Sequence, residues 1–273
     1  MPELPEVETV RRGIIPHLIN QRIVNVIIRQ AQLRWPIPPY FAKNVKGQII
    51  NQITRRGKYL LLHTAQGTVI IHLGMSGHLR VITREEDPKK HDHVDLIMDN
   101  GCSMRFNDPR RFGTILWTND DPMLHPLLAE LGPEPLSDDF NAGYLLQRAQ
   151  RRHIAIKQFI MDGRIVVGVG NIYANEALFM ARIHPLAAAG KISFKQYKIL
   201  VEAIKKILSA AIESGGSTIR DFLNSEGKPG YFVQKLQVYG RVGLPCHKCK
   251  TVLEEIRISD RSSVFCSNCQ IKY

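Results

Sequence analysis

The stretch Lys58-Tyr59-Leu60-Leu61-Leu62-His63, followed after four residues by Thr68-Val69-Ile70-Ile71-His72-Leu73, decides the class of fold. Both runs are short, apolar or β-branched, and bounded by glycine or charged residues, which is typical of β-strands. Similar runs at 23–28 and 78–83 place them in a strand-rich region over 22–118. Strands this short and this consecutive favour a β-sandwich or a barrel over a parallel α/β sheet.

A helical pattern precedes this strand-rich region. Val7, Val10 and Ile14 lie three and four residues apart, so residues 6–18 are expected to form an amphipathic helix. Pro16 should end or kink that helix, because proline cannot donate a backbone hydrogen bond.

The region after the strands is also helical. Residues 131–137 contain glycine and prolines and are interpreted as a linker. Beyond it, Ser193 and Gln196 form a capping box that opens a long helix. The other helices expected here cover residues 142–152, 153–162 and the stretch from Asn171 through Met180.

Four of the five cysteines lie in the last 28 residues, as Cys246-x-x-Cys249 and, after sixteen intervening residues, Cys266-x-x-Cys269. This spacing is typical of a zinc site with four thiolate ligands and no open coordination position. A disulfide pair is the alternative, but the chain shows no secretory signal and is expected in a reducing compartment. We therefore expect one structural Zn²⁺.

Charge indicates the class of partner. The chain has 37 Lys and Arg against 25 Asp and Glu, a formal net charge of +12. A basic protein without a membrane-spanning run most often binds a polyanion, and nucleic acid is the leading candidate. A basic protein without such a partner is the alternative that charge alone leaves open.

The N-terminus offers an unusual nucleophile. Removal of Met1 would expose Pro2 as a secondary amine, and α-amino groups titrate near ~8 against ~10.4 for lysine. A neutral amine can attack a sugar carbon and form an iminium. Glu3 and Glu6 lie beside it and could move protons. Position alone, however, favours an ordinary second residue and two carboxylates at a helix start.

Several basic clusters fall in expected loops, and each is either a phosphate contact or a solvated charged turn. His91 and His93 could be read as a metal pair, but no third ligand is evident, and DNA contact or simple exposure is favoured. Met75 lies in a glycine-flanked turn, where it is either core or a wedge for a base stack. The clusters are Arg55–Lys58, Lys89–His93, Asp108–Gly113 and Arg151–His153.

Taken together, these segments resemble one family along essentially the whole chain. The chain resembles the bacterial formamidopyrimidine-DNA glycosylases, which repair 8-oxoguanine. Leu4 favours them over the endonuclease VIII group, which typically has glycine there and prefers oxidised pyrimidines. The segments that carry the resemblance are Pro2–Thr9, Arg56–Leu60, His72–Gly77, Asp108–Gly113, Gly168–Tyr173, Gly215–Thr218 and Val238–Arg241 before the cysteines.

The resemblance implies an enzyme that excises oxidised purines and then nicks the strand. Pro2 would form a Schiff base at C1′, Glu3 would act as acid and base, and Lys58 and Arg261 would serve β- and δ-elimination. Residues 217–231 would form a lid over the flipped base. The residues that would hold phosphates are His91, Arg110, Arg152 and Asn171. Those that would fill the gap left by the flipped base are Met75, Arg110 and Phe112.

The expected fold is α+β, with an N-terminal antiparallel β-sandwich and leading helix (1–130), a helical helix–two-turns–helix domain (131–237) and a zinc-finger hairpin (238–273). The expected partner is double-stranded DNA with oxidised purines or abasic sites. We expect a cytoplasmic, nucleoid-associated bacterial monomer. The alternatives are an endonuclease VIII-like glycosylase for oxidised pyrimidines and a non-catalytic zinc-containing DNA-binding protein.

Overall fold

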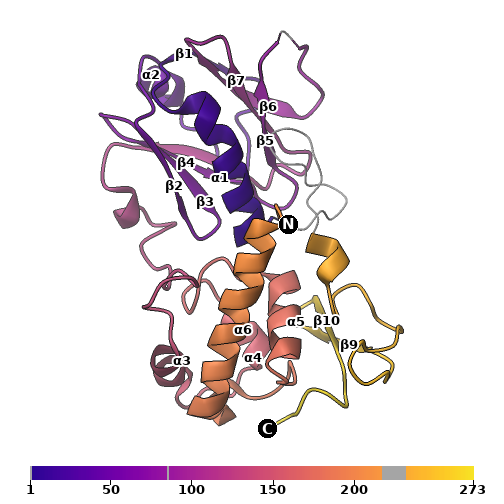
Figure 1. Cartoon of the computed structure of the whole chain (residues 1–273). Helices are drawn as coiled ribbons and strands as arrows, with labels where there is room; N and C mark the ends of the chain where they lie inside the picture. Colours follow the sequence, from indigo (N-terminus) through magenta and orange to yellow (C-terminus); the bar gives the residue numbers. More distant parts are fainter. Residues whose placement is uncertain (1, 85, 217–231) are drawn as a thin grey trace. The chain divides into compact units, whose positions relative to one another are not determined.

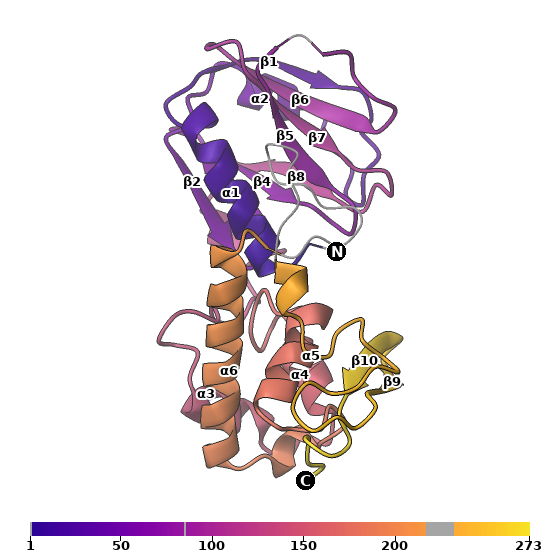
Figure 2. The same cartoon turned by 45° about the vertical axis from the view of Figure 1, so that its right-hand side comes forward.

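A computed structural model describes residues 2–84, 86–216 and 232–273. The contacts within it define two compact units (Figures 1 and 2). Unit 1 comprises Met1–Glu130 with Ser214–Tyr231, and unit 2 comprises Leu131–Glu213 with Phe232–Tyr273. The expected lid, residues 217–231, lies outside the described residues. The separate zinc-finger domain starting at residue 238 stays a prediction.

Unit 1 contains two four-stranded sheets, and every neighbouring pair of strands in them is antiparallel. One sheet has the order β1-β6-β7-β5 and the other β2-β3-β4-β8. The predicted antiparallel architecture is confirmed. The strands are β1 (Ile23–Ile28), β2 (Gln52–Arg56), β3 (Tyr59–His63), β4 (Thr68–His72), β5 (His78–Ile82), β6 (Asp92–Met98), β7 (Ser103–Asn107) and β8 (Thr114–Thr118).

A single apolar core joins the two sheets into a sandwich. Leu60 of β3 and Phe106 of β7 are both fully buried and belong to the same cluster of core residues. Two helices complete this unit, α1 (Leu4–Leu18) and α2 (Phe41–Val45). Helix α1 lies against β2 and β3 (Figure 1) and buries Val7, Val10 and Ile14, as the spacing predicts.

The expectation for Pro16 is wrong in part, because α1 continues past it to Leu18. Proline removes only the hydrogen bond that its own nitrogen would donate. In the last turn that loss is small, since the Ile19 N–H still donates to the Ile15 carbonyl at 3.1 Å.

Two clusters expected in loops are partly strand. Arg55 and Arg56 form the end of β2 and pair with Leu60 and Tyr59, which leaves only Gly57-Lys58 as the turn. Asp92 and His93 open strand β6, and both are buried, so simple exposure of His93 is wrong. The clusters at 108–113 and 151–153 do lie in loops, as predicted.

Unit 2 is helical with one β-hairpin. Its long helix contacts α3 and α5, and the hairpin packs on α5 (Figure 1). The capping box is confirmed, because the Ser193 N–H donates to Gln196 Oε1 at 2.7 Å and the Gln196 N–H to Ser193 Oγ at 3.3 Å. The elements are α3 (Ala142–Ala149), α4 (Ile156–Met161), α5 (Asn171–Met180), α6 (Phe194–Glu213), β9 (Glu254–Ile258) and β10 (Arg261–Phe265).

Helices α3 and α4 are shorter than predicted. Helix α3 ends at Ala149, and Arg151 takes a left-handed backbone conformation with φ of 59°. Arg152 and His153 therefore lie in the loop between α3 and α4. Among the helices of the described residues, none combines the length and the hydropathy that crossing a bilayer requires.

Candidate functional site

The N-terminal residues are held by a reciprocal cap at the start of α1. The Glu3 backbone N–H donates to Glu6 Oε2 at 2.8 Å, and the Glu3 carboxylate accepts from the Glu6 N–H. Pro2, Glu3 and Glu6 are all buried. Gly216, with φ of +82°, lies against Glu6, and a Cβ added there would sit 3.1 Å from Glu6 Oε1. The residue that follows Pro2 is therefore fixed by hydrogen bonds on both its backbone and its side chain.

Lys58 lies in the β2–β3 turn, and its charge acts on His72, a residue for which no motif predicts a role. Burial, and then the charges of Lys58 and Arg34, lower the pKa of His72 to about 4, so this imidazole is neutral near pH 7. The Gly74 N–H donates to His72 Nδ1 at 3.0 Å, which leaves the proton on Nε2. A neutral His72 with its proton on Nε2 can therefore donate a hydrogen bond from that nitrogen but cannot accept one there.

Met75 and Phe112 lie on two loops that meet. Gly74 has φ of +63°, and a Cβ there would sit 2.4 Å from the Phe112 carbonyl carbon, so only glycine allows this approach. The Arg110 guanidinium lies 4.8 Å from the centre of the Phe112 ring. Met75 and Phe112 remain about 40% exposed, at 40% and 41%. Large apolar side chains on exposed loops suit insertion into a base stack better than core packing.

His91 belongs to the same edge of unit 1. Its carbonyl accepts from the Asp108 N–H at 3.0 Å, and its ring lies edge-on to His93 with centroids 6.3 Å apart. His93 donates from Nε2 to the Asp108 carbonyl at 2.8 Å. That bond accounts for His93, and a metal pair is not needed to explain it.

Arg152 and Asn171 belong to unit 2. The Arg152 guanidinium lies 5.7 Å from the Phe159 ring centre. The Arg152 backbone carbonyl accepts from the Gly190 N–H at 2.9 Å. Asn171 is the first residue of α5, where backbone N–H groups attract anions. Its Oδ1 is buried and has no hydrogen-bond partner among the described residues, so the side chain retains hydrogen-bonding capacity.

Arg261 opens strand β10 and is exposed. Its Nη1 lies 4.0 Å from the Met161 sulfur, at a cavity of about 280 Å³ that Lys157 and Asp162 also line. This arrangement places an exposed guanidinium at the rim of a cavity of unit 2.

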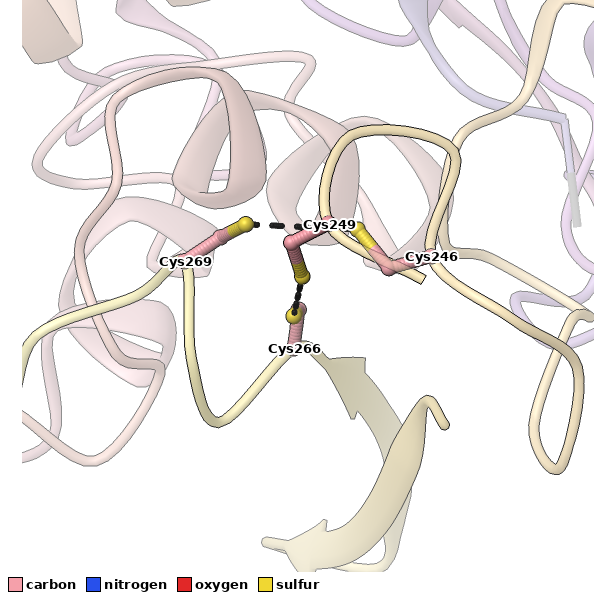
Figure 3. A group of neighbouring side chains, drawn as sticks. All are labelled: Cys246, Cys249, Cys266 and Cys269. Atoms are coloured by element: carbon pink, nitrogen blue, oxygen red, sulfur yellow. Dashed lines mark hydrogen bonds between the residues drawn. The ribbon is translucent and has the colours of Figure 1, made fainter. Parts of the chain in front are cut away.

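The four cysteines of the predicted metal site converge (Figure 3). Their sulfur atoms all lie within 4.8 Å of one another. Hydrogen bonds from Thr251 and Asn268 lower the pKa of Cys249 to about 5, whereas burial and the neighbouring sulfurs raise that of Cys269 to about 12. Four thiolates this close repel one another unless a cation binds them, so the set fits one structural zinc ion.

Helix α5 holds the segment that leads to these cysteines. The buried Glu176 carboxylate accepts the N–H groups of Gln237, Val238 and Tyr239 at 2.8–2.9 Å. Asn175 Oδ1 accepts from the Val264 N–H at 2.9 Å. Neither residue is recognisable from the sequence alone, because their partners lie more than sixty positions away.

Family models cover most of the chain. The "Formamidopyrimidine-DNA glycosylase N-terminal domain" matches residues 1–115, and the "Formamidopyrimidine-DNA glycosylase H2TH domain" matches residues 131–223. A third, "Zinc finger found in FPG and IleRS", matches residues 243–271, which include all four clustered cysteines.

Full-length relatives and solved structures agree with these matches. The formamidopyrimidine-DNA glycosylase of Photobacterium profundum is 56% identical over 270 residues, covering 99% of this chain and all of the relative. The structure of MutM (Fpg) from Thermus thermophilus superposes with a TM-score of 0.90 at 35% identity, and both chains are covered fully. Lactococcus lactis Fpg bound to DNA with an abasic site gives 0.91 at 32% identity, covering 99% of this chain and all of the other.

Proposed function

Because this chain belongs to the formamidopyrimidine-DNA glycosylase family, we propose that it excises 8-oxoguanine and formamidopyrimidines from duplex DNA and then cleaves the abasic site by β,δ-elimination. It is a DNA glycosylase that acts on damaged DNA, with lyase activity and one structural zinc. What we propose beyond this activity is the choice of purine substrates, the route of elimination and the roles of the individual residues.

In the proposed reaction, the Pro2 amine attacks C1′ of the damaged nucleotide while the bond from C1′ to the base breaks. The departing base takes a proton, and Glu3 donates a proton to O4′ as the C1′–O4′ bond breaks, so the sugar ring opens and an iminium remains between Pro2 and C1′. Glu3 then accepts protons in the later steps. The resulting iminium acidifies the C2′ proton, so Lys58 can assist loss of the 3′ phosphate by β-elimination. Arg261 assists δ-elimination, which releases the 5′ phosphate.

The reciprocal cap between Glu3 and Glu6 is the observation that carries this proposal. It fixes the residue attached to Pro2 and keeps a buried carboxylate one position from the nucleophile. At neutral pH, roughly a tenth of an α-amino group is unprotonated, against under about a thousandth of an ordinary lysine. Nucleophile and proton-transfer group are thus supplied by adjacent residues.

The proposed partner is duplex DNA with oxidised purines or abasic sites. The net charge of +12 suits a phosphate backbone, with His91, Arg110, Arg152 and Asn171 as its contacts. The exposed side chains of Met75 and Phe112, with Arg110, would fill the gap when the lesion leaves the stack. We propose a monomer that works at the bacterial nucleoid.

Borohydride trapping tests the function. Incubation with an 8-oxoguanine duplex and borohydride should give a covalent complex whose DNA-linked peptide begins at Pro2, and mass spectrometry should show that Met1 is absent. Pro2→Gly replaces the secondary amine with a primary amine and should trap weakly, whereas an N-terminal extension should abolish trapping but not binding. A trapped peptide containing Lys58 would show that the nucleophile is misassigned.

Two controls separate the alternatives. An undamaged duplex should yield no adduct. Faster reaction on a thymine glycol duplex than on an 8-oxoguanine duplex would favour the endonuclease VIII-like function. Absence of any adduct on either lesion would favour a DNA-binding protein without catalysis.

A further inference from the structure

We propose that Asp108 and Ser76 are positioning residues that hold the expected DNA-contact loops of unit 1, residues 73–77 and 108–113, in one arrangement. The proposal deepens the proposed function and rests on it. It assigns to a buried carboxylate and a buried hydroxyl the task of aligning side chains that lie on separate loops.

The Asp108 side chain joins the two loops directly. Asp108 is fully buried, and its Oδ1 accepts the Ser76 hydroxyl at 2.7 Å. Its Oδ2 accepts the Gly113 N–H at 2.7 Å, which closes its own loop. A buried carboxylate is costly unless such donors satisfy it, so both bonds are favoured together. The two oxygens of one carboxylate therefore set the distance between loop 73–77 and loop 108–113.

The Ser76 hydroxyl continues this connection. It donates to Asp108 and accepts the Arg110 N–H at 3.2 Å. Loop 73–77 is itself closed by the Gly77 N–H, which donates to the Leu73 carbonyl at 2.8 Å. The backbone of Arg110 is thus fixed to the loop that carries Met75.

The backbone of Asp108 adds the third segment. Its N–H donates to the His91 carbonyl at 3.0 Å, and its carbonyl accepts from His93 Nε2 at 2.8 Å and from the Arg111 N–H at 3.1 Å. Pro109 follows Asp108 at the turn position where its fixed φ is favourable. Asp108 therefore binds the segment that carries His91 as well as both loops.

On these segments of unit 1, each residue expected to contact DNA either hydrogen-bonds to Asp108 itself or is next in sequence to a residue that does. Met75 precedes Ser76, His91 bonds Asp108 itself, Arg110 bonds Ser76, and Phe112 precedes Gly113. Removing one bond need not unfold the sandwich, but it releases the relative placement of these groups. A displacement of about 1 Å at a reacting complex can cost up to about a hundredfold in rate.

Chemistry predicts which substitutions matter. Ser76→Ala removes the hydroxyl that joins the loops and leaves the Gly113 bond in place. Asp108→Asn turns one acceptor into an N–H₂ donor, which cannot accept from both Ser76 and Gly113. Asp99→Asn is the matched control, because Asp99 Oδ1 also accepts a backbone N–H, that of Arg22, at 3.1 Å. Asp99 directly follows β6, at the opposite end of that strand from Asp92, which pairs with Asn107 beside Asp108.

The experiment measures single-turnover rates on two duplexes, one with 8-oxoguanine and one with a pre-formed abasic site. Ser76→Ala should slow release of 8-oxoguanine about tenfold or more, and nicking of the abasic site by less than about twofold, because no damaged base has to be extruded there. Asp108→Asn should show the same selectivity. Asp99→Asn should match the wild type on both duplexes.

Each outcome bears on the proposal. Equal losses on both duplexes would contradict the predicted selectivity for the damaged base and overturn the proposal, as would wild-type rates for Ser76→Ala. If Asp108→Asn fails to fold, Ser76→Ala alone decides. A wild-type protein that neither releases 8-oxoguanine nor becomes trapped would instead refute the proposed function.

Discussion

The Lys157 ammonium donates to the Ser263 hydroxyl at 2.7 Å, across 106 positions of sequence, and to the Ser262 carbonyl at 2.6 Å. Both Lys157 and Ser263 are buried. Lys157 of helix α4 thereby fixes strand β10, which begins at Arg261. The placement of the Arg261 guanidinium therefore depends on a contact made from that helix.

Lys157→Met should destabilise the protein by about 1–3 kcal/mol, because it leaves the buried Ser263 hydroxyl and the part-buried Ser262 carbonyl without their donor. The measurement is the free energy of unfolding in urea. Lys206→Met, at an exposed position of α6, should change it by less than about 0.5 kcal/mol. Equal effects of the two substitutions would contradict the importance of the Lys157 contacts.

Cys249→Ala should abolish zinc binding, since it removes one of four ligands from a closed site. Atomic absorption should find about one zinc per chain in the wild type, the number that a single four-thiolate site takes. Cys102→Ala, at the half-buried cysteine outside the cluster, should keep the metal. DNA affinity should fall in Cys249→Ala while unit 1 stays folded. Active protein without zinc would refute a structural metal.

Glu8→Gln should remove part of the stability that depends on pH. Burial alone raises the pKa of Glu8, but hydrogen bonds from Arg11 and Arg12 and the charges of Arg11 and Arg55 outweigh it and lower the pKa to about 2. Because the folded pKa lies below the ordinary 4.5, Glu8 stabilises the fold above that pH, and the contribution is lost as pH falls towards 2.

Urea midpoints between pH 3 and 7 measure this effect. The wild type should lose stability more steeply than Glu8→Gln on acidification. Asp120→Asn, at an exposed carboxylate of unit 1, should retain the wild-type profile. Parallel profiles for Glu8→Gln and the wild type would show that the ion pairs of Glu8 contribute nothing measurable.

Arg152→Ala should weaken binding to damaged and undamaged duplexes alike. It should also reduce the slope of log affinity against log salt by about 0.9, the value for one neutralised phosphate. Met75→Ala is the control, because an uncharged side chain can lower affinity without altering the slope. An unchanged slope in Arg152→Ala would remove Arg152 from the phosphate contacts.

The fold was predictable where local pattern decides it. The runs at 23–28, 58–63 and 68–73 become β1, β3 and β4 within one residue, and the apolar side chains of β3 and β4 are mostly buried, whereas in β1 only Ile23 is. The capping box at Ser193 and the four-cysteine site likewise depend on short spacings. Asp92 and His93 were misplaced, since charged residues enter a strand only when distant partners satisfy them. For Asp92 these partners include Arg80, at 3.0 Å.

The candidate site divides in the same way. Pro2, Glu3 and the exposed Met75 could be proposed from motifs, whereas Asp108 and Glu176 could not. The Ser76–Asp108 bond joins positions 32 apart, and Glu176 accepts from N–H groups 61 to 63 positions away. The residues next to a buried carboxylate in the sequence do not indicate which distant groups donate hydrogen bonds to it. The roles of Asp108 and Glu176 can therefore be recognised only in the folded structure.

The cap at Glu3 also determines how much freedom the proposed nucleophile has. The pyrrolidine ring of Pro2 fixes its own nitrogen relative to its Cα, and the next amide is held by Glu6. The backbone torsion ψ of Pro2 is then the main rotation that moves the amine. Ordering a flexible terminal residue during the reaction would cost about 1–2 kcal/mol of conformational entropy. In this chain most of that ordering is completed when α1 forms, so only this one rotation is left to be ordered when the proposed nucleophile meets the sugar.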